Sequence, residues 1–330
     1  MMSTSFVAAV TALHASRTVV VTTHRNPDGD AIGSALGMWH LLRSLGKNVT
    51  VVLPNAAPSN LRWMEGASDM LVYGPDANPI LDAADTIVVL DLNDVTRLEA
   101  LGEAIVQRQA TIVNIDHHTR PQAFATVQWI DEEACSTAIM VASVAEAMGV
   151  MTSAMAMCLY TGIMTDTGSF RFPRTTAHVH RTVATLIEAG ADPVRAYDEV
   201  MNRGSVGRAQ LLGQSLAGMN VLADGRLCTM VVRAADLDRF GCTTEDVEGF
   251  VAQTLSLEGV TMGILFVELD SEAKISFRSK GTAYVRDLAA SYGGGGHVYA
   301  AGARVRQRPF QDVVNEVTAA AVAELTGSSR

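Results

Sequence analysis

Short apolar runs rich in β-branched residues recur through the first half of the chain, and each has the length of a strand. They predict strands over residues 18–23, 49–53, 86–90 and 111–115. Between the first two runs, residues 32–45 carry apolar side chains at helical spacing, and Gly46 is a typical helix stop. A second helix is predicted over residues 95–107. Strands that alternate with helices in this way predict βαβ units around a parallel sheet.

The pattern changes in the second half of the chain. Residues 134–165 contain Glu146 as their only charge, but Gly149 interrupts them, so two buried helices are expected rather than a membrane span. Further strands are predicted over 227–232, 262–269 and 274–278, with a helix over 282–291. The chain is expected to form an α/β protein with a parallel-sheet domain over 1–190, a helical connector over 191–213 and a smaller α+β domain over 214–330.

Composition narrows the range of functions. Of the 330 residues, 48% are hydrophobic and 18% are charged, which is typical of a globular protein and not of a disordered one. The formal net charge of −10 argues against a broad basic face for nucleic acid, so a phosphate substrate must be bound locally. The four cysteines form no CxxC pair, and no positively charged leader region is present at the start. We therefore expect a cytoplasmic protein that does not enter a membrane.

Carboxylates and imidazoles gather where the predicted strands end. His24, Asp28 and Asp30 follow the first strand, Asp91 follows the strand over 86–90, and Asp116, His117 and His118 follow the strand over 111–115. Asp166 lies where an apolar helix gives way to a turn that contains glycine. In an open parallel sheet the carboxyl ends of the strands share one edge, which is where ligands bind. These four stretches are therefore expected to converge on one site.

Such a group of charges needs a cation among them, because four carboxylates and two or three imidazoles would otherwise repel one another. An oxygen-rich donor set with a minority of imidazole suits Mn²⁺, with Mg²⁺ as the alternative. Six ligands are too many for one ion that must also hold substrate, which favours a pair of ions bridged by a carboxylate. Each stretch by itself could be a helix cap or a turn, but four such stretches together favour a metal centre.

A run of glycines in the second half suggests a phosphate-binding loop. In "SYGGGGHVYAAG" the backbone N–H groups of Gly294, Gly295 and Gly296 can approach a phosphate closely, and His297 adds a donor. Arg278, at the end of the strand "KISFR", can bind a phosphate with two hydrogen bonds. The glycine run alone could equally be a flexible turn. Arg171, close after Asp166, is a further candidate phosphate contact, with an ordinary surface arginine as the alternative.

Taken together, "HRNPDGDAIGS", "DLND", "IDHH" and "TGIMTDTGSFRF" resemble the DHH phosphoesterase superfamily. The stretches "ISFRSKG" and "YGGGGHVYAAG" resemble its DHHA1 domain. The resemblance covers nearly the whole chain and is greatest to the branch of nanoRNases and pAp phosphatases. It implies a Rossmann-like DHH domain joined by the helical connector to a DHHA1 domain.

The resemblance also assigns residues to roles. It implies two Mn²⁺ ions that share Asp91 as a bridging ligand. The first ion would also be held by His24 and Asp28, and the second by Asp30, His117 and Asp166. Asp116 would orient its neighbours, and His118 would face the scissile phosphate, so that Asp91, Asp116 and His118 form the catalytic set. Arg278, Ser279 and the glycine loop with His297 would hold the end of the substrate that is not cleaved.

The implied activity is hydrolysis of short oligoribonucleotides to mononucleotides, and of 3'-phosphoadenosine 5'-phosphate (pAp) to AMP, by two-metal activation of water. The implied partners are short single strands and small phosphorylated nucleotides, with no long duplex and no membrane, and a homodimer is left open. The alternatives are a phosphodiesterase for cyclic or linear dinucleotides, an inorganic pyrophosphatase, and a nucleotide sensor without turnover.

Overall fold

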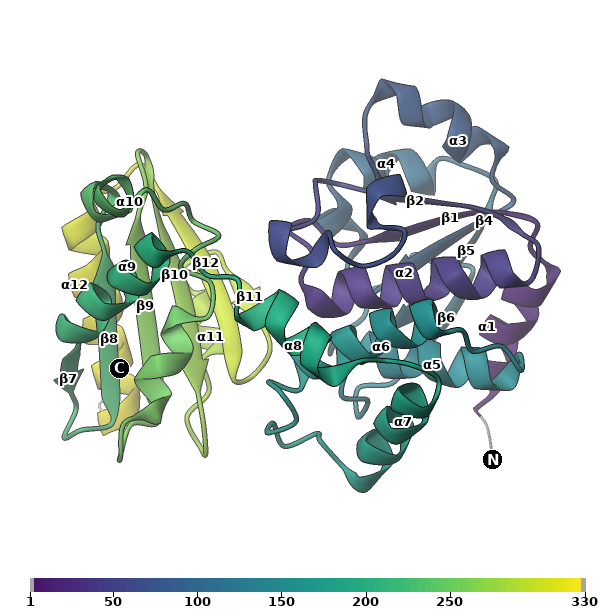
Figure 1. The fold of residues 1–330 in the computed structure, drawn as a ribbon. Helices are drawn as coiled ribbons and strands as arrows, with labels where there is room; N and C mark the ends of the chain where they lie inside the picture. Colours follow the sequence, from purple (N-terminus) through teal and green to yellow (C-terminus); the bar gives the residue numbers. More distant parts are fainter. Residues whose placement is uncertain (1–2, 328–330) are drawn as a thin grey trace. The chain divides into compact units, whose positions relative to one another are not determined.

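The computed structural model describes residues 3–327, and this part of the chain folds as two compact units. The division between the units falls between Arg203 and Gly204, inside the segment 191–213. Each unit is built on its own six-stranded sheet (Figure 1).

The first unit contains the parallel sheet that the strand pattern predicts. Its strands are β1 (Thr18–Thr23), β2 (Asn48–Leu53), β3 (Leu71–Val72), β4 (Thr86–Leu90), β5 (Thr111–Asp116) and β6 (Val127–Ile130). They lie in the order β3-β2-β1-β4-β5-β6, and every neighbouring pair is parallel. The sheet order reverses its direction at β1, so the carboxyl ends of β1 and β4 lie beside each other at a topological switch point.

Helices cover both faces of this sheet. They are α1 (Thr4–Ala15), α2 (Gly29–Ser44), α3 (Asn78–Ala83), α4 (Ala100–Val106), α5 (Thr137–Ala147), α6 (Ser153–Asp166), α7 (Ala177–Glu188) and α8 (Pro193–Met201). Val19 and Val21 point from β1 into the larger core, which α1, α2, α5, α6 and α7 complete. Val20 points the other way, into the smaller core with α3 and α4. Figure 1 shows these two layers on opposite sides of the sheet.

Glycines let α2 and α6 pack unusually closely. A Cβ atom at Gly33 of α2 would lie 2.6 Å from the carbonyl oxygen of Cys158 in α6, and one at Gly162 of α6 would lie 2.6 Å from Cβ of Ala138 in α5. Both distances are shorter than side chains tolerate, so only glycine fits at these two positions. The close approach matters for function, because α2 carries Asp30 in its first turn and α6 ends at Asp166.

The second unit has a mixed sheet. Its strands are β7 (Asn220–Leu222), β8 (Leu227–Val232), β9 (Met262–Glu268), β10 (Glu272–Ser279), β11 (Gly295–Gly296) and β12 (Ala300–Arg306). They lie in the order β11-β12-β10-β9-β8-β7, in which only β8 and β9 pair in parallel. The helices are α9 (Val206–Ala217), α10 (Ala234–Phe240), α11 (Arg286–Ala290) and α12 (Phe310–Thr326). Ile275 and Phe277 face α11 and α12, whereas Leu265 and Val267 face the core that includes α9 and α10.

Two of the predicted helices are shorter or more broken than expected. The stretch 95–107 is a 3-10 turn (Val95–Leu98) followed by α4, because Glu99 takes a left-handed backbone with φ of +54°. The stretch 282–291 is helical only over Arg286–Ala290, because the N–H of Val285 donates to the carbonyl of Val298 outside the helix. The two buried helices expected over 134–165 are present as α5 and α6. None of the helices described within residues 3–327 combines the length and the apolarity needed to cross a membrane.

Candidate active site

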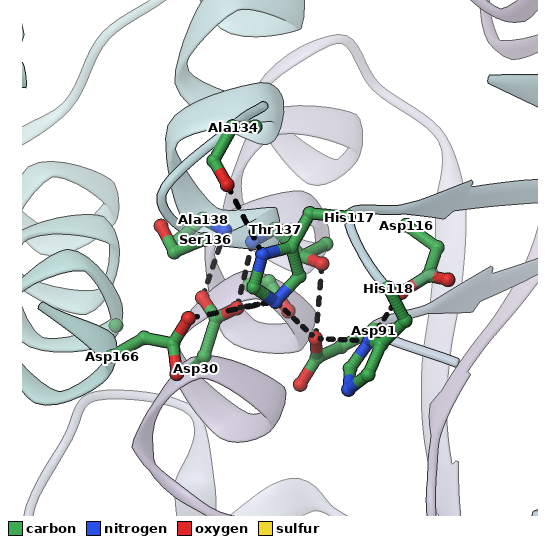
Figure 2. A network of polar contacts seen from close by, with 12 residues as sticks. Asp30, Asp91, Asp116, His117, His118, Ala134, Ser136, Thr137, Ala138 and Asp166 are labelled. Carbon is green, nitrogen blue, oxygen red and sulfur yellow. Dashed lines mark hydrogen bonds and ion pairs between the residues drawn. The ribbon is translucent and has the colours of Figure 1, made fainter. Parts of the chain in front are cut away.

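The carboxylates and imidazoles at the strand ends form one cluster in the first unit (Figure 2). His24 follows β1, Asp28 and Asp30 lie at the start of α2, and Asp91 follows β4. Asp116 is the last residue of β5, with His117 and His118 directly after it, and Asp166 is the last residue of α6. The structure therefore brings together all the residues that the sequence places at this edge of the sheet.

Asp91 lies at the centre of the cluster, with a different histidine at each of its two oxygens. Its Oδ2 lies 3.4 Å from Nε2 of His24, and its Oδ1 lies 3.4 Å from Nε2 of His117. The hydroxyl of Thr137 donates to Oδ1 at 3.1 Å. The backbone of Asp91 is left-handed, with φ of +58°, which is a strained conformation for a residue with a side chain.

Backbone carbonyls fix the orientation of both imidazoles. Nδ1 of His24 donates to the carbonyl of Arg25 at 2.8 Å, and Nδ1 of His117 donates to the carbonyl of Ala134 at 3.3 Å. In each ring the donation leaves Nε2 directed at the carboxylates. This is the tautomer in which Nε2 can act as a metal ligand.

Two further carboxylates meet Nε2 of His117. Oδ2 of Asp30 lies 3.7 Å from it and Oδ2 of Asp166 lies 3.5 Å from it. Asp30 is itself held by the first turn of α5, because the N–H groups of Thr137 and Ala138 donate to its two oxygens at 2.6 and 2.9 Å. Thus Asp30, Asp166 and His117 converge from three separate elements.

Asp28 differs from the other carboxylates because its side chain is largely exposed. It caps α2, accepting hydrogen bonds from the N–H groups of Asp30 and Ala31 at 3.1 and 3.0 Å. The same Oδ1 lies 4.0 Å from Nε2 of His24. Asp28 is therefore both a helix cap and the outermost member of the group formed with His24 and Asp91.

Burial and the closeness of the charges shift the pKa values of several residues in the cluster. Burial, followed by the charges of Asp91 and Asp166, raises the pKa of Asp30 well above its ordinary value. Burial also raises the pKa of Asp166 to about 7. Burial alone would lower the pKa of His117, but its hydrogen bond with Asp91 and the charge of Asp166 raise it to about 9. Hydrogen bonds from His117 and His24 outweigh burial and keep the pKa of Asp91 well below its usual range.

These residues fit a pair of divalent cations. His24, Asp28 and Asp91 form one group of closely spaced donors, and Asp30, His117 and Asp166 form another. Asp91 lies within reach of both groups through its two oxygens. Carboxylate oxygens with a minority of imidazole nitrogens are the donors that hard or intermediate divalent metals prefer. A cation in each group would also remove the repulsion that raises the pKa of Asp30.

His118 is oriented by a carboxylate. Its Nδ1 donates to Oδ1 of Asp116 at 2.7 Å, and Asp116 is fully buried at the end of β5. Oδ1 of Asp91 lies 3.6 Å from the same nitrogen. The other oxygen of Asp116, Oδ2, is buried without a hydrogen-bond partner within the described residues.

Comparison with known proteins accounts for this arrangement. The DHH family, N-terminal domain, matches residues 18–163, and the DHHA1 domain matches residues 224–326. The bifunctional oligoribonuclease and PAP phosphatase NrnA of Thermus thermophilus is 32% identical, over 93% of this chain and 90% of that protein. The chain belongs to the DHH family.

A second NrnA and a solved structure extend the similarity. The NrnA of Bacillus subtilis is 24% identical over 87% of this chain and 89% of that protein. The crystal structure of an exopolyphosphatase-related protein from Bacteroides fragilis superposes with a TM-score of 0.92 at 30% identity, and the match covers 98% of both chains. The predicted family, with a DHH domain followed by a DHHA1 domain, is confirmed.

Several residues that position the DHH cluster escaped the sequence analysis. Asn114, buried in β5, donates through Nδ2 to the carbonyls of Val89 and Leu92 and so holds the turn that carries Asp91. Thr137 contacts both Asp30 and Asp91. A signal was available for Asn114, since asparagine is rare inside an apolar strand such as "TIVNID".

Arg171 lies outside the hydrogen-bonded cluster. It is exposed in the turn that follows α6, and its guanidinium carbon lies 5.6 Å from the ring centroid of Phe172. The turn is strained, because Ser169 and Phe170 both take positive φ angles. A role of Arg171 in phosphate binding stays a prediction.

In the DHHA1 domain the predicted substrate contacts lie at one end of the mixed sheet. Arg278 and Ser279 end β10, and Gly295 and Gly296 form the edge strand β11. Burial lowers the pKa of the Arg278 guanidinium, and the hydroxyl of Ser279 is buried without a hydrogen-bond partner within residues 3–327. A Cβ at Gly294 would lie 2.1 Å from the carbonyl oxygen of Gly302, so close packing on β12 also requires glycine there.

Proposed function

We propose that this protein is a manganese-dependent phosphoesterase that cleaves short oligoribonucleotides to mononucleotides and removes a phosphate from pAp. The chain is a phosphoester-hydrolysing enzyme of the DHH family. The observation that carries the finer proposal is Asp91, whose two oxygens face two separate groups of metal donors. The names of the NrnA relatives support the choice of substrates.

Two ions would be held by six side chains. His24, Asp28 and Asp91 would hold one, and Asp30, Asp91, His117 and Asp166 the other. When bound, a pair of divalent metals lowers the pKa of water to make a nucleophile and neutralises charge on the phosphoryl oxygens. We propose Mn²⁺ as the metal because oxygen donors outnumber nitrogen donors in both groups, and Mg²⁺ is the alternative.

His118 would act on the substrate itself. The hydrogen bond to Asp116 fixes Nδ1 as the donor, and we propose Nε2 as the atom that contacts the phosphate. An imidazole held by a buried carboxylate can stabilise charge that develops on a phosphoryl oxygen, or donate a proton to the leaving group. Asp116 is thereby a positioning residue, and His118 is the catalytic residue.

The DHHA1 domain would hold the part of the substrate that is not cleaved. Arg278, Ser279, Gly294, Gly295, Gly296 and His297 are the residues proposed for this contact. The hydroxyl of Ser279, buried without a partner among the described residues, and the half-buried guanidinium of Arg278, which donates to the carbonyl of Phe277, support the proposal, since both can take an additional polar partner. Arg171 of the DHH domain would add a phosphate contact.

The chain's charge favours short substrates. A formal net charge of −10 disfavours the binding of a long strand of phosphates, because such binding depends on an excess of positive charge. We therefore propose single-stranded oligoribonucleotides of two to four residues and small phosphorylated nucleotides as substrates, and no long duplex. The four free cysteines are all buried, which agrees with the proposed cytoplasmic location.

The decisive experiment incubates the purified protein and Mn²⁺ with pAp, diribonucleotides, cyclic dinucleotides and pyrophosphate in parallel, and identifies the products by chromatography. We expect AMP from pAp and mononucleotides from diribonucleotides. Asp91→Asn serves as the inactive variant, and Asp76→Asn, at an exposed position, as its matched control. Faster turnover of cyclic dinucleotides would favour the cyclic-dinucleotide alternative. Turnover of pyrophosphate alone, or of none of the four, would contradict the proposal.

A further inference from the structure

Two tyrosines stand exposed at the same end of the mixed sheet as the proposed substrate contacts. Tyr284 is 51% exposed and Tyr299 is 38% exposed, which is high for aromatic side chains of this size. Their ring centroids lie 5.8 Å apart, with the ring planes inclined at 52°. The two rings therefore form a small aromatic surface that faces solvent.

The segments that carry the two rings are fixed to each other and to β10. The N–H of Ser279 donates to the carbonyl of Tyr299 at 2.9 Å, and the N–H of Val285 donates to the carbonyl of Val298 at 2.9 Å. The hydroxyl of Tyr299 donates to the carbonyl of Gly281 at 3.1 Å. The first two hydrogen bonds fix the backbone segments that carry the rings, and the third also fixes the ring of Tyr299, which lowers the entropy cost of binding on it.

The aromatic surface adjoins the residues proposed to bind phosphate. Tyr299 lies two positions after His297, in a turn that the N–H of His297 closes by donating to the carbonyl of Ala300 at 2.7 Å. The backbone partner of Tyr299 is Ser279, at the end of β10. Arg278, one position earlier in β10, pairs with Ala300 of β12. The buried hydroxyl of Ser279, which has no hydrogen-bond partner in the described part of the chain, lies at the same strand end. The residues proposed to bind phosphate and the two exposed tyrosines are therefore adjacent along the backbone.

A phosphate site beside flat aromatic rings has the composition of a nucleotide site. Every nucleobase presents a π-face, so stacking on tyrosine binds bases with little regard to sequence. Tyrosine also tolerates exposure because its hydroxyl remains hydrated or bonded while the ring offers apolar area.

We propose that Tyr284 and Tyr299 form a stacking platform for the base of the nucleotide held by the DHHA1 domain. The inference rests on the proposed function. It adds a contact that any of the bases can make but that a ligand without a base cannot make. An enzyme that degrades many different short RNAs needs this kind of contact.

The test compares two ligands that differ only in the base. The dissociation constants of AMP and of ribose 5-phosphate are measured by calorimetry with the full chain and Mn²⁺. We expect the wild type to bind AMP at least about 10-fold more tightly than ribose 5-phosphate. Tyr284→Ala should reduce that advantage by about 5-fold or more, whereas Tyr284→Phe should retain it. The matched control is Tyr197→Ala, since Tyr197 on α8 is 45% exposed and belongs to neither set of proposed contacts.

Variants of Tyr299 provide a second test in case Tyr284→Ala does not fold correctly. Tyr299→Phe removes only the hydrogen bond to Gly281 and should keep most of the preference for AMP, while Tyr299→Leu should lose it. Equal binding of AMP and ribose 5-phosphate by the wild type would overturn the platform. So would an unchanged preference in both Tyr284→Ala and Tyr299→Leu. Because the assay measures binding of a product, a protein that cleaves none of the proposed substrates can still pass it, and the two proposals fail separately.

Discussion

Nδ1 of His118 lies 2.7 Å from a carboxylate oxygen of Asp116, and the carboxylate is fully buried. The two residues are only two positions apart, at the end of β5, so the strand itself sets the geometry of the pair. His118 is in this way separated in role from His117, whose Nδ1 is held by a backbone carbonyl and whose Nε2 faces three carboxylates.

His118→Ala should therefore lower kcat by about 10²-fold while both metal ions stay bound, because a donor to the phosphate is lost but no ligand is removed. Elemental analysis after gel filtration measures the metal, and steady-state kinetics with pAp measures kcat. His14→Ala, the same change at an exposed position, is the control. Loss of metal from the His118 variant would make His118 a ligand instead.

Asp116→Ala should act through His118. Without the buried carboxylate the imidazole can turn, and we expect kcat to fall by about 10-fold or more. In the double variant Asp116→Ala/His118→Ala, removing Asp116 should cost no further activity. Additive losses in the double variant would show that Asp116 acts by a separate route, such as direct support of a metal ligand.

Asp91→Asn should lower turnover by more than about 10²-fold and weaken metal binding in both groups of donors, because one carboxylate serves both. Titration of the metal-free variant with Mn²⁺, followed by calorimetry, measures the two affinities. Asp28→Asn provides a comparison, since Asp28 belongs to only one group. Normal affinity for both ions in Asp91→Asn would refute the bridging role.

Gly33→Ala should destabilise the protein by about 1 to 3 kcal/mol, because its Cβ would lie 2.6 Å from the carbonyl of Cys158 and force α2 away from α6. The same displacement should weaken metal binding, since Asp30 and Asp166 lie on these two helices. Urea denaturation and Mn²⁺ titration are the two measurements.

Gly74→Ala is the matched control for Gly33→Ala. Gly74 has an extended backbone, with φ of −162°, and among residues 3–327 no neighbouring atom lies within 4 Å of the position of a Cβ. Alanine should therefore leave stability unchanged or raise it slightly. If Gly33→Ala is as stable as this control, the two helices are not held together as closely as described.

Glu272 should make the stability of the second unit decrease at acidic pH. Its carboxylate accepts hydrogen bonds from Arg306, at 3.0 Å, and from Arg304, and the bond to Arg306 is the main cause of its lowered pKa. A pKa lower in the folded than in the unfolded state stabilises the fold above the ordinary range of glutamate, and this contribution is lost as the pH falls through the folded pKa.

Glu272→Gln should thus cost about 1 kcal/mol at pH 7 and less at pH 3, because the stabilisation by the lowered pKa is lost as the pH falls toward the folded pKa. Urea unfolding at the two pH values measures the difference. Glu258→Gln, at an exposed position, is the control. An equal cost at both pH values would assign the effect to packing.

Much of the fold and of the cluster could be predicted from the sequence alone, for physical reasons. The strand β1 occupies the predicted residues 18–23 because six consecutive residues of "TVVVTT" are β-branched. Parallel pairing then puts the charges that follow each strand at one edge. The helix boundaries were less predictable. Glu99 interrupts the stretch 95–107 because its backbone is left-handed, and a glutamate in the sequence does not predict such a backbone.

The supporting residues of the site were harder to find from sequence. Asn114 and Thr137 act through contacts with residues 22 to 107 positions away, and no local pattern indicates such partners. The requirement for glycine at Gly33 of α2 depends on its close contact with Cys158 of α6, which lies 125 positions away in the sequence. Tyr284 and Tyr299 are likewise distant in sequence and come together only through the pairing of the β10 end with the β12 turn.

The left-handed backbone of Asp91 sets the requirements of folding against those of catalysis. A glycine at position 91 would relieve about 1 kcal/mol of strain. Selection for heat resistance alone would set this relief against the loss of the contacts that the carboxylate makes with Thr137, His24 and His117. Selection for turnover should exclude glycine at this position outright, because glycine offers no ligand to either group of donors. The strained backbone after β4 is thus retained for the sake of the side chain that it carries.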